Sequence, residues 1–227
     1  MGKGKKANRD RWTRFAEEAE DCVHAAINAL PAPLREQAGT LPVEFAARPD
    51  PEWMDVTKIK PQIRTYQGRY AILGGDWSPF WHDVIDLLGM ENLYMKMYDQ
   101  PELVDSIMQH IVDYYLAVSR RIFDAAAGLI DIFFVGNDFG GQTGPLLSPA
   151  LFARFCLPHM ERLIDLGHSY RLKVQLHCCR GFAPLIPLMI EAGLDGLHAI
   201  QPSCYGMDLA KLKADFGDKI LFNGAID

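Results

Sequence analysis

The sequence predicts an α/β fold built around a parallel sheet, and three observations support this prediction. Along residues 69–227, five short apolar segments of strand length alternate with segments of helical periodicity. The turns between them are short, as in successive βαβ units. No G-x-G-x-x-G sequence opens a helix after the first clear strand, so a dinucleotide-binding sheet has little support. A doubly wound sheet and a (β/α)8 barrel both fit the alternation.

Composition narrows the class of protein. The chain has 227 residues, of which 49% are hydrophobic and 23% charged, a balance that suits one sizeable globular core. The formal net charge of −6 argues against nucleic acid as a partner, and the chain has no apolar run of about 18 residues that would predict a membrane span. The five cysteines are odd in number and irregularly spaced. We therefore expect a cytoplasmic protein, in which a Cys/His pair indicates a metal or catalysis rather than a disulfide.

Residues 1–68 are expected to lead into the sheet as part of a single domain. Helical periodicity covers residues 9–30, and Pro31 and Pro33 should end that helix. The remainder of this lead-in is rich in proline and charge, and residues 41–45 are its one candidate strand.

The βα repeats are expected over residues 69–227. The predicted strands are 70–73, 130–135, 173–176, 196–200 and 220–223, and the predicted helices are 80–88, 101–127, 148–168, 182–192 and 208–216. Pro101 suits the first turn of the longest helix and Gly128 its end. Ser148 followed by Pro149 predicts the start of the next helix.

Reactive side chains concentrate at the end of the strand over residues 173–176. His177, Cys178 and Cys179 follow this strand directly, at the position in a βα unit where catalytic groups collect. Residues two apart on an extended backbone face the same side, so His177 and Cys179 should point together and Cys178 away. Imidazole and thiolate are natural zinc ligands. The alternative is that the cysteines are small buried hydrophobes and the histidine a hydrogen-bonded strand end.

Asn137 and Asp138 follow the strand over residues 130–135 and should lie at the same rim. We predict that both are catalytic, through contact with substrate or metal-bound water. The alternative is that they cap the loop, a common use of Asn and Asp beside glycines.

Other polar residues near strand ends are weaker candidates. Asp76 and Gln201 each follow a predicted strand and are expected to contact substrate. His198 lies inside its strand and is expected to be a hydrogen-bonded core histidine. Cys204 is expected to be an ordinary loop thiol.

Several motifs, in order and at suitable spacing, resemble the uroporphyrinogen decarboxylase superfamily over residues 68–227. They are Gly140-Gly-Gln-Thr-Gly-Pro-Leu-Leu-Ser-Pro, Phe155-Cys-Leu-Pro-His, Leu176-His-Cys-Cys-Arg-Gly, Ile186 to Gly193, Ile200-Gln-Pro and Leu221-Phe-Asn-Gly-Ala-Ile-Asp. The resemblance implies a (β/α)8 TIM barrel with its site at the carboxyl ends of the strands. It also implies that Asp227 lies among functional residues, so we predict a catalytic role for it.

The resemblance leaves two enzyme chemistries to compare. The decarboxylases carry an N-terminal signature resembling Met-Arg-Gln-Ala-Gly-Arg-Tyr, of which Tyr66-Gln-Gly-Arg-Tyr70 retains little, and a turn tyrosine that here falls on His82. The zinc-dependent methyltransferases exchange a methyl group with a corrinoid and carry an H-x-C motif followed by a distant cysteine. His177 and Cys179 match the first two ligands of that motif.

The resemblance therefore implies a zinc-dependent methyltransferase with a small-molecule methyl donor or acceptor. A separate corrinoid protein would present the cobamide cofactor. Uroporphyrinogen decarboxylation is the alternative activity, and a non-catalytic binding protein that retains the barrel is the second alternative. The third zinc ligand is expected beyond Asp227, with the last strand of the barrel. If the barrel closes earlier, Cys204 and Asp227 are the first alternatives.

Overall fold

The computed structural model describes residues 54–225, together with Pro51 and five positions between His24 and Glu36. The chain forms two compact units, residues 1–50 and residues 51–227. In the first unit the described positions are helical, and they include Ala32, Arg35 and Glu36. Helical structure therefore also occurs beyond residue 30, and the prediction that Pro31 and Pro33 end the helix over residues 9–30 stays a prediction. The candidate strand over residues 41–45, and Asp227, lie outside the described residues.

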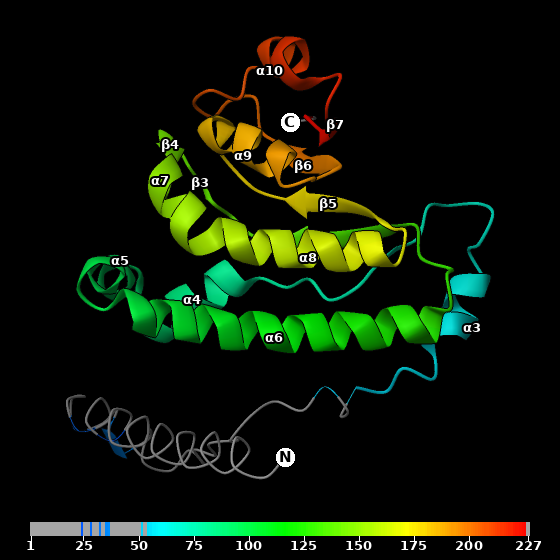
Figure 1. The fold of residues 1–227 in the computed structure, drawn as a ribbon, viewed down its shortest axis with the longest axis horizontal. Helices are drawn as coiled ribbons and strands as arrows, with labels where there is room; N and C mark the ends of the chain where they lie inside the picture. The colour runs from blue at the N-terminus through cyan, green and yellow to red at the C-terminus, as the bar shows by residue number, and fades with distance from the viewer. Residues whose placement is uncertain are drawn as a thin grey trace. The chain divides into compact units, whose positions relative to one another are not determined.

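The second unit is built on a five-stranded parallel sheet, shown in Figure 1. Its strands are β1 (Leu73–Gly74), β2 (Ile132–Gly136), β5 (Lys173–His177), β6 (Gly196–Ile200) and β7 (Leu221–Gly224), hydrogen-bonded in that order. Every neighbouring pair is parallel. The five predicted strands are thus confirmed, with small shifts in their bounds.

The strand β1 is shorter than predicted and begins at Leu73 rather than at residue 70. The reason lies in Asp131, whose Oδ2 accepts a hydrogen bond of 2.8 Å from the backbone N–H of Ile72. The Ile72 carbonyl accepts from the N–H groups of both Asp131 and Ile132. At Ile72 the Asp131 side chain therefore takes the place of a backbone partner, and regular pairing of β1 with β2 starts at the next residue, Leu73.

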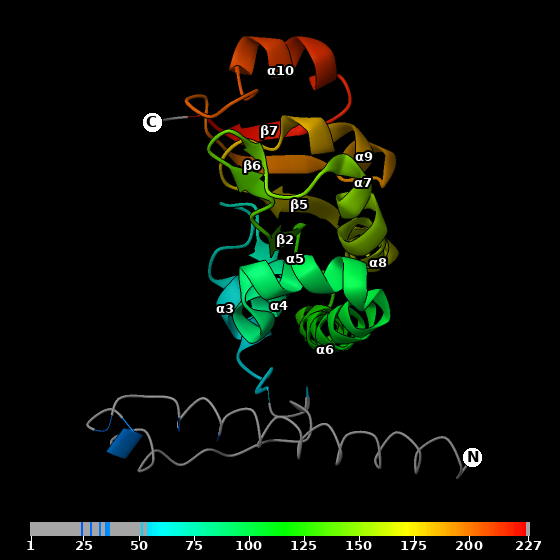
Figure 2. The same cartoon turned by 90° about the vertical axis from the view of Figure 1, so that its left-hand side faces the viewer.

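The strand order indicates a barrel-like rather than a doubly wound sheet. The order advances in one direction and never reverses, whereas a doubly wound sheet has a point of reversal. Right-handed crossovers with a constant direction place successive helices on one face of the sheet. Figure 2 shows α8 (Leu157–Ser169) and α9 (Ile186–Glu191) on the same side of it. The fold is α/β and corresponds to part of a (β/α)8 barrel.

The helices largely follow the predicted bounds. They are α3 (Ile59–Arg64), α4 (Phe80–Leu88), α5 (Met90–Asp99), α6 (Pro101–Ala126), α7 (Pro149–Leu151), α8, α9 and α10 (Leu209–Phe216), with a 3-10 turn at Ala183–Leu185. Helix α5 was not predicted; Gly89, at φ 77°, separates it from α4, and Leu93 and Met97 bury its inner face. None of the described helices is long and apolar enough to cross a membrane.

The helix predicted over residues 148–168 is interrupted by a wider turn. Ser148 starts it as expected, because its Oγ accepts from the N–H of Leu151 at 3.2 Å. Residues Phe152–Cys156 then form a π-helical turn before α8 begins. Pro158 has no N–H to bond to the carbonyl of Arg154, which favours such a local change of helix geometry.

Alternation along the strands gives the sheet two different faces. Phe133, Val135, Val174 and Leu176 are fully buried on the face that carries the helices. Figure 1 shows α8 beside α6, and the ion pair of Arg162 with Asp113 joins these two helices. On the opposite face the register places Gly136, His177 and His198 in one layer across β2, β5 and β6. The sheet therefore delivers both histidines to the same side.

Candidate metal centre

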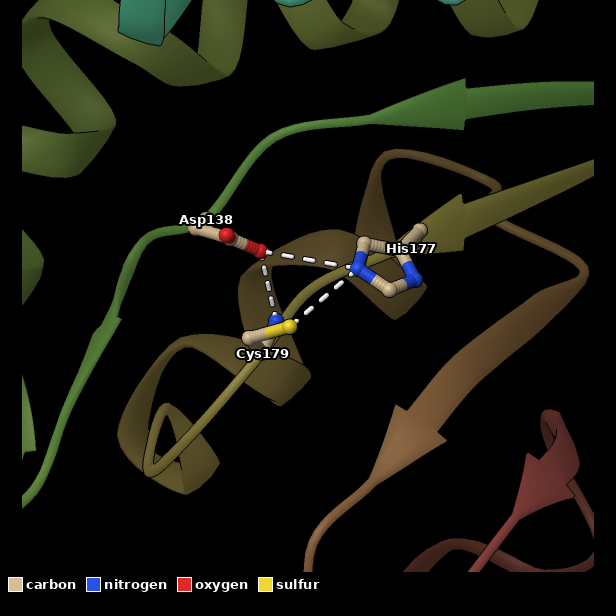
Figure 3. A group of neighbouring side chains, drawn as sticks. All are labelled: Asp138, His177 and Cys179. Carbon is tan, nitrogen blue, oxygen red and sulfur yellow. Dashed lines mark hydrogen bonds and ion pairs between the residues drawn. The ribbon is translucent and has the colours of Figure 1, made fainter.

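Three donor side chains meet at the carboxyl ends of β2 and β5. His177 is the last residue of β5 and pairs in register with Gly136, the last residue of β2. Asp138 follows β2 by two residues, and Cys179 follows β5 by two. Figure 3 shows the three side chains converging from these two strand ends. Parallel pairing thus brings together residues that lie about forty positions apart in the sequence.

The donor atoms are close to one another. His177 Nε2 lies 3.2 Å from Cys179 Sγ and 3.8 Å from Asp138 Oδ1. All three ligand atoms lie within 4.8 Å of one another. Asp138 Oδ1 also accepts a hydrogen bond of 2.7 Å from the backbone N–H of Cys179. This bond fixes the start of the loop after β5 against the loop after β2.

The donor set fits zinc in chemistry and in spacing. Zinc takes imidazole nitrogen, thiolate sulfur and carboxylate oxygen, and catalytic sites use three protein ligands and an open position. Tetrahedral coordination with ordinary zinc bond lengths separates two such donors by roughly 3.4–3.6 Å. The separations of 3.2 and 3.8 Å from His177 Nε2 lie on either side of this range. Small side-chain rotations would therefore complete the coordination.

Electrostatics at the centre favour a neutral imidazole. Burial lowers the pKa of His177, and the neighbouring Asp138 carboxylate only partly opposes this effect. Neutral imidazole is the form that binds a metal. Burial, followed by the charge of Asp138, raises the pKa of Cys179. A bound cation reverses this last effect, because a coordinating thiol loses its proton.

Cys178 faces away from the other two, as the alternation predicted. Its side chain is fully buried, and its Sγ accepts a hydrogen bond of 3.3 Å from the backbone N–H of Phe139. Burial raises the pKa of this thiol. Cys178 therefore belongs to the core, and it supplies a matched control for Cys179.

The loop that carries Cys179, which we call the metal loop, is held by hydrogen bonds to two other loops. Gly141 forms an antiparallel bridge to Gly181, whose N–H donates to the Gly141 carbonyl at 2.9 Å. Gln201 Oε1 accepts a hydrogen bond of 2.6 Å from the N–H of Arg180. The predicted substrate residue Gln201 thus anchors the metal loop in this structure, and its contact with substrate stays a prediction.

The side chains of Asn137 and Asp76 are used within the fold. Asn137 is fully buried; its Oδ1 accepts from the N–H of Trp81 at 2.9 Å, and its Nδ2 donates to the Ser78 carbonyl at 3.0 Å. Asp76 Oδ1 accepts from the N–H of Ser78 at 2.8 Å, and burial raises its pKa. Both residues hold the turn between β1 and α4, and the catalytic role of Asn137 and the substrate contact of Asp76 stay predictions.

The expectation that His198 is a hydrogen-bonded core histidine was right about the hydrogen bond and wrong about the burial. It is half-buried, and its Nδ1 lies 2.7 Å from Nδ1 of His177. The strand register, which pairs His177 with His198, could have predicted this neighbour. No single-strand pattern reveals it, because alternation within β6 does not show which residue of β5 lies opposite.

Trp77 and His82 also adjoin the centre. The Trp77 ring lies 5.2 Å from that of His177 and is 42% exposed. A Cβ at Gly136 would lie only 1.9 Å from this indole, so glycine allows the ring to pack there. His82, on the first turn of α4, places Nε2 3.5 Å from Asp138 Oδ2. Neither residue was assigned to the site from the sequence.

Of the two alternative ligands named from the sequence, only Cys204 can be placed, and it does not join the group. Cys204 is buried and is not among the described residues whose donor atoms converge. Asp227 lies outside the described residues, so its catalytic role stays a prediction. Asp138 completes the group of three side chains that could hold a metal ion, and the catalytic role predicted for it stays a prediction.

Comparisons with known proteins find similarity in sequence and in fold. The profile of the family described as uroporphyrinogen decarboxylase (URO-D) matches residues 54–227. A uroporphyrinogen decarboxylase from Syntrophotalea carbinolica is 26% identical over 135 residues, covering 57% of this chain and 37% of that protein. A solved methyltransferase from Methanosarcina mazei shares the fold with a TM-score of 0.51 at 16% identity. That alignment covers 75% of this chain and 57% of the other.

The chain thus spans between about a third and three fifths of the length of these two relatives. The family profile nevertheless covers more than half of the chain and includes the whole sheet and the three-donor group. The chain belongs to the uroporphyrinogen decarboxylase family.

Proposed function

We propose that this chain is a zinc-dependent methyltransferase that moves a methyl group to or from a corrinoid cofactor. A separate corrinoid protein would present the cofactor at the rim formed by the strand ends. The proposal includes a complete (β/α)8 barrel in the whole protein, of which the described residues supply five parallel strands.

The convergence of His177, Cys179 and Asp138 carries the proposal. Nitrogen, sulfur and oxygen donors within 4.8 Å of one another are the set that zinc takes, and a hydrogen bond already joins the Cys179 backbone N–H to the Asp138 carboxylate. The likeness to a solved methyltransferase supports the fold on which this chemistry would operate. Cofactor-free decarboxylation offers no comparable reason for a thiol and an imidazole to meet here.

Each donor would have a separate task. His177 presents Nε2, Cys179 its sulfur and Asp138 a carboxylate oxygen, so the set carries up to two negative charges against a divalent cation. Zinc held there would lower the pKa of a bound thiol, or polarise a bound oxygen, at neutral pH. The Asp138 carboxylate would be the weakest of the three metal ligands, because its Oδ1 already accepts a hydrogen bond from the backbone N–H of Cys179.

The rim beside the donors presents an exposed apolar ring. Trp77 packs against the rings of Phe134 and His177, with centroids 5.2 Å away in both cases, yet it keeps 42% of its surface exposed. An indole in this position can contact the methyl-bearing part of a substrate. We propose that the small-molecule donor or acceptor rests on this ring.

The test is metal content combined with methyl transfer. Zinc measured in the purified wild type, Cys179→Ala and Cys178→Ala should fall in the Cys179 variant and persist in the Cys178 variant. Wild type should also consume methylcobalamin in the presence of a simple alkyl thiol, and Cys179→Ala should not. Equal zinc loss in both variants, or methyl transfer that survives Cys179→Ala, would contradict the proposal.

Decarboxylation of uroporphyrinogen is the second candidate. It is favoured by the name of the relative from Syntrophotalea carbinolica, which matches 57% of this chain. Turnover of uroporphyrinogen by metal-free protein would support this candidate over the methyltransferase.

A further inference from the structure

The two histidines of the site form a contact that the proposed reaction does not itself require. His177 and His198 are register partners on neighbouring strands, and their Nδ1 atoms lie 2.7 Å apart. A hydrogen bond at this distance needs a proton on one Nδ1 and a lone pair on the other. The contact therefore links the tautomer of one ring to that of its neighbour.

The surroundings of the other ring nitrogen, His177 Nε2, show which tautomer of His177 suits metal binding. His177 Nε2 faces Cys179 Sγ and Asp138 Oδ1, and the 3.8 Å to the carboxylate is too long for a hydrogen bond. A metal needs the lone pair of this Nε2. In a neutral imidazole the proton must then lie on Nδ1, where His198 Nδ1 can accept it.

We infer that His198 is a positioning residue that keeps the proton of His177 on Nδ1 and so leaves Nε2 free for the metal; this inference rests on the proposed zinc site. Metal-binding histidines usually donate their second N–H to a carboxylate or a carbonyl. Here an unprotonated imidazole nitrogen takes that place. His198 itself carries its proton on Nε2.

The backbone of β6 is distorted at the point where His198 is presented. The pairing of β6 with β7 shifts between His198 and Ile200, and the intervening Ala199 has φ 63°. Left-handed backbone is rare for alanine, and bulges near sites commonly redirect a side chain. Gly224 lies close by: a Cβ there would be 3.2 Å from the Ala199 nitrogen.

Neighbouring groups hold the His198 ring and backbone in place. Phe134 lies edge-on to it at 5.3 Å, and also edge-on to His177 at 6.4 Å. The His198 carbonyl accepts from the N–H of Cys178 at 3.3 Å. The ring is therefore fixed by packing and by its strand, as a positioning role requires.

Zinc affinity of His198 variants tests the inference in the full chain. His198→Asn places an amide oxygen near the position of Nδ1 and can still accept from His177, whereas His198→Leu cannot. Competition with a chromophoric chelator should show about 10–100-fold weaker binding in His198→Leu, and a loss of less than about threefold in His198→Asn. Wild-type affinity in His198→Leu, or equal weakening in both variants, would overturn the inference.

The tautomer itself gives a second readout that needs no metal. Long-range proton–nitrogen NMR on the metal-free full chain, with His177→Gln to assign the signal, should show His177 protonated on Nδ1. His198→Leu should move that proton toward Nε2. Protonation of His177 on Nε2 in the wild type would overturn the inference. Zinc binding no stronger in wild type than in Cys179→Ala would instead reject the proposed function, and the NMR result would still decide the role of His198.

Discussion

Gly140 packs directly against the backbone of Cys179. A Cβ at Gly140 would lie 2.2 Å from the Cys179 carbonyl oxygen and 3.0 Å from the nitrogen of Gly181. Real Cβ atoms do not approach a backbone oxygen so closely, so no other residue fits without moving the loop. The glycine-rich stretch after β2 forms a hairpin of β3 (Gly140–Gly141) and β4 (Gly144–Pro145). Its glycines allow this hairpin to lie against the metal loop.

This contact predicts that Gly140→Ala weakens zinc binding. The added methyl must displace the Cys179 carbonyl, which shifts the sulfur relative to His177 Nε2. We expect at least about a tenfold loss of zinc affinity, since outer contacts of a metal site are commonly worth 10–100-fold. Stability should fall by roughly 1–3 kcal/mol, as for other overpacked positions.

Gly167→Ala is the matched control for this experiment. A Cβ at Gly167 would lie 2.4 Å from a methyl carbon of Val174, so this variant is also overpacked, but on the helix side of the sheet. It should lose comparable stability in chemical denaturation while keeping wild-type zinc affinity. An equal loss of affinity in both variants would show that Gly140 acts only through general stability.

Asp138 can be tested as a metal ligand separately from its structural hydrogen bond. Asp138→Asn keeps an oxygen to accept from the Cys179 N–H but removes the negative charge, whereas Asp138→Ala removes both. Zinc affinity should fall at least about tenfold in both variants. The free energy of unfolding should fall by about 1 kcal/mol more in the alanine variant, because only that variant loses the hydrogen bond.

His82→Gln is the control for charge near Asp138. The contact between His82 Nε2 and Asp138 Oδ2 is 3.5 Å long, and the two side chains are 41% and 35% exposed. Exposed pairs of this kind contribute little, so this variant should bind zinc within about threefold of wild type, the tolerance set for His198→Asn. Undiminished zinc binding by Asp138→Asn would exclude the carboxylate as a ligand.

The order of strands and helices could be predicted from the sequence because the patterns that indicate each element span only a few neighbouring residues. Strand length, helical periodicity and terminal residues such as Pro101 and Ser148 are read within a few positions, and they predicted the five strands and most helices. Where a distant group intervened, the prediction failed. β1 starts late because Asp131 bonds to Ile72, a contact across about sixty positions.

The site was predictable only as far as it lies on one strand. Alternation placed His177 and Cys179 together and Cys178 apart, and the structure confirms both statements. Asp138 and His198 belong to the neighbouring strands, and their distances depend on register, which no single segment encodes. The structure therefore adds two contacts that the sequence did not predict: Asp138 lies beside His177 and Cys179, and His198 contacts the His177 ring.

Stability is expected to fall on mild acidification because of His159. This histidine is 7% exposed, stacks near the Phe80 ring at 5.7 Å, and its Nδ1 has no hydrogen-bond partner among the described residues. Burial, with a smaller contribution from Arg162, lowers its pKa to about 4 from an ordinary value of 6.5. Between about pH 4 and pH 6.5, His159 is therefore protonated in the unfolded chain and neutral in the folded chain.

The sign follows from this difference in proton binding. Because the unfolded state binds more protons, the free energy of unfolding rises with pH and is highest above about pH 6.5. When the pH falls from about 7 to about 5, protonation of His159 in the unfolded chain should lower the free energy of unfolding by roughly 2 kcal/mol. His159→Leu and His159→Phe should both lose this part of the pH dependence in urea titrations. Unchanged dependence in both variants would show that other groups are responsible.

The last prediction concerns uroporphyrinogen, the substrate in the name of the relative from Syntrophotalea carbinolica. We expect no decarboxylation of it by this chain, with or without zinc. The arginine signature that resembles the decarboxylases is largely missing at Tyr66-Gln-Gly-Arg-Tyr70, where Tyr66 and Tyr70 are more than half exposed. The centre itself presents the Asp138 carboxylate, which would repel the many carboxylates of that substrate. Such groups need cationic partners to bind.

Chromatography of the oxidised products, beside an established decarboxylase as positive control, should show no coproporphyrin above the rate without enzyme. Its appearance at a higher rate, persisting in Cys179→Ala, would assign this chain to the decarboxylases and leave the three-donor group without a catalytic role.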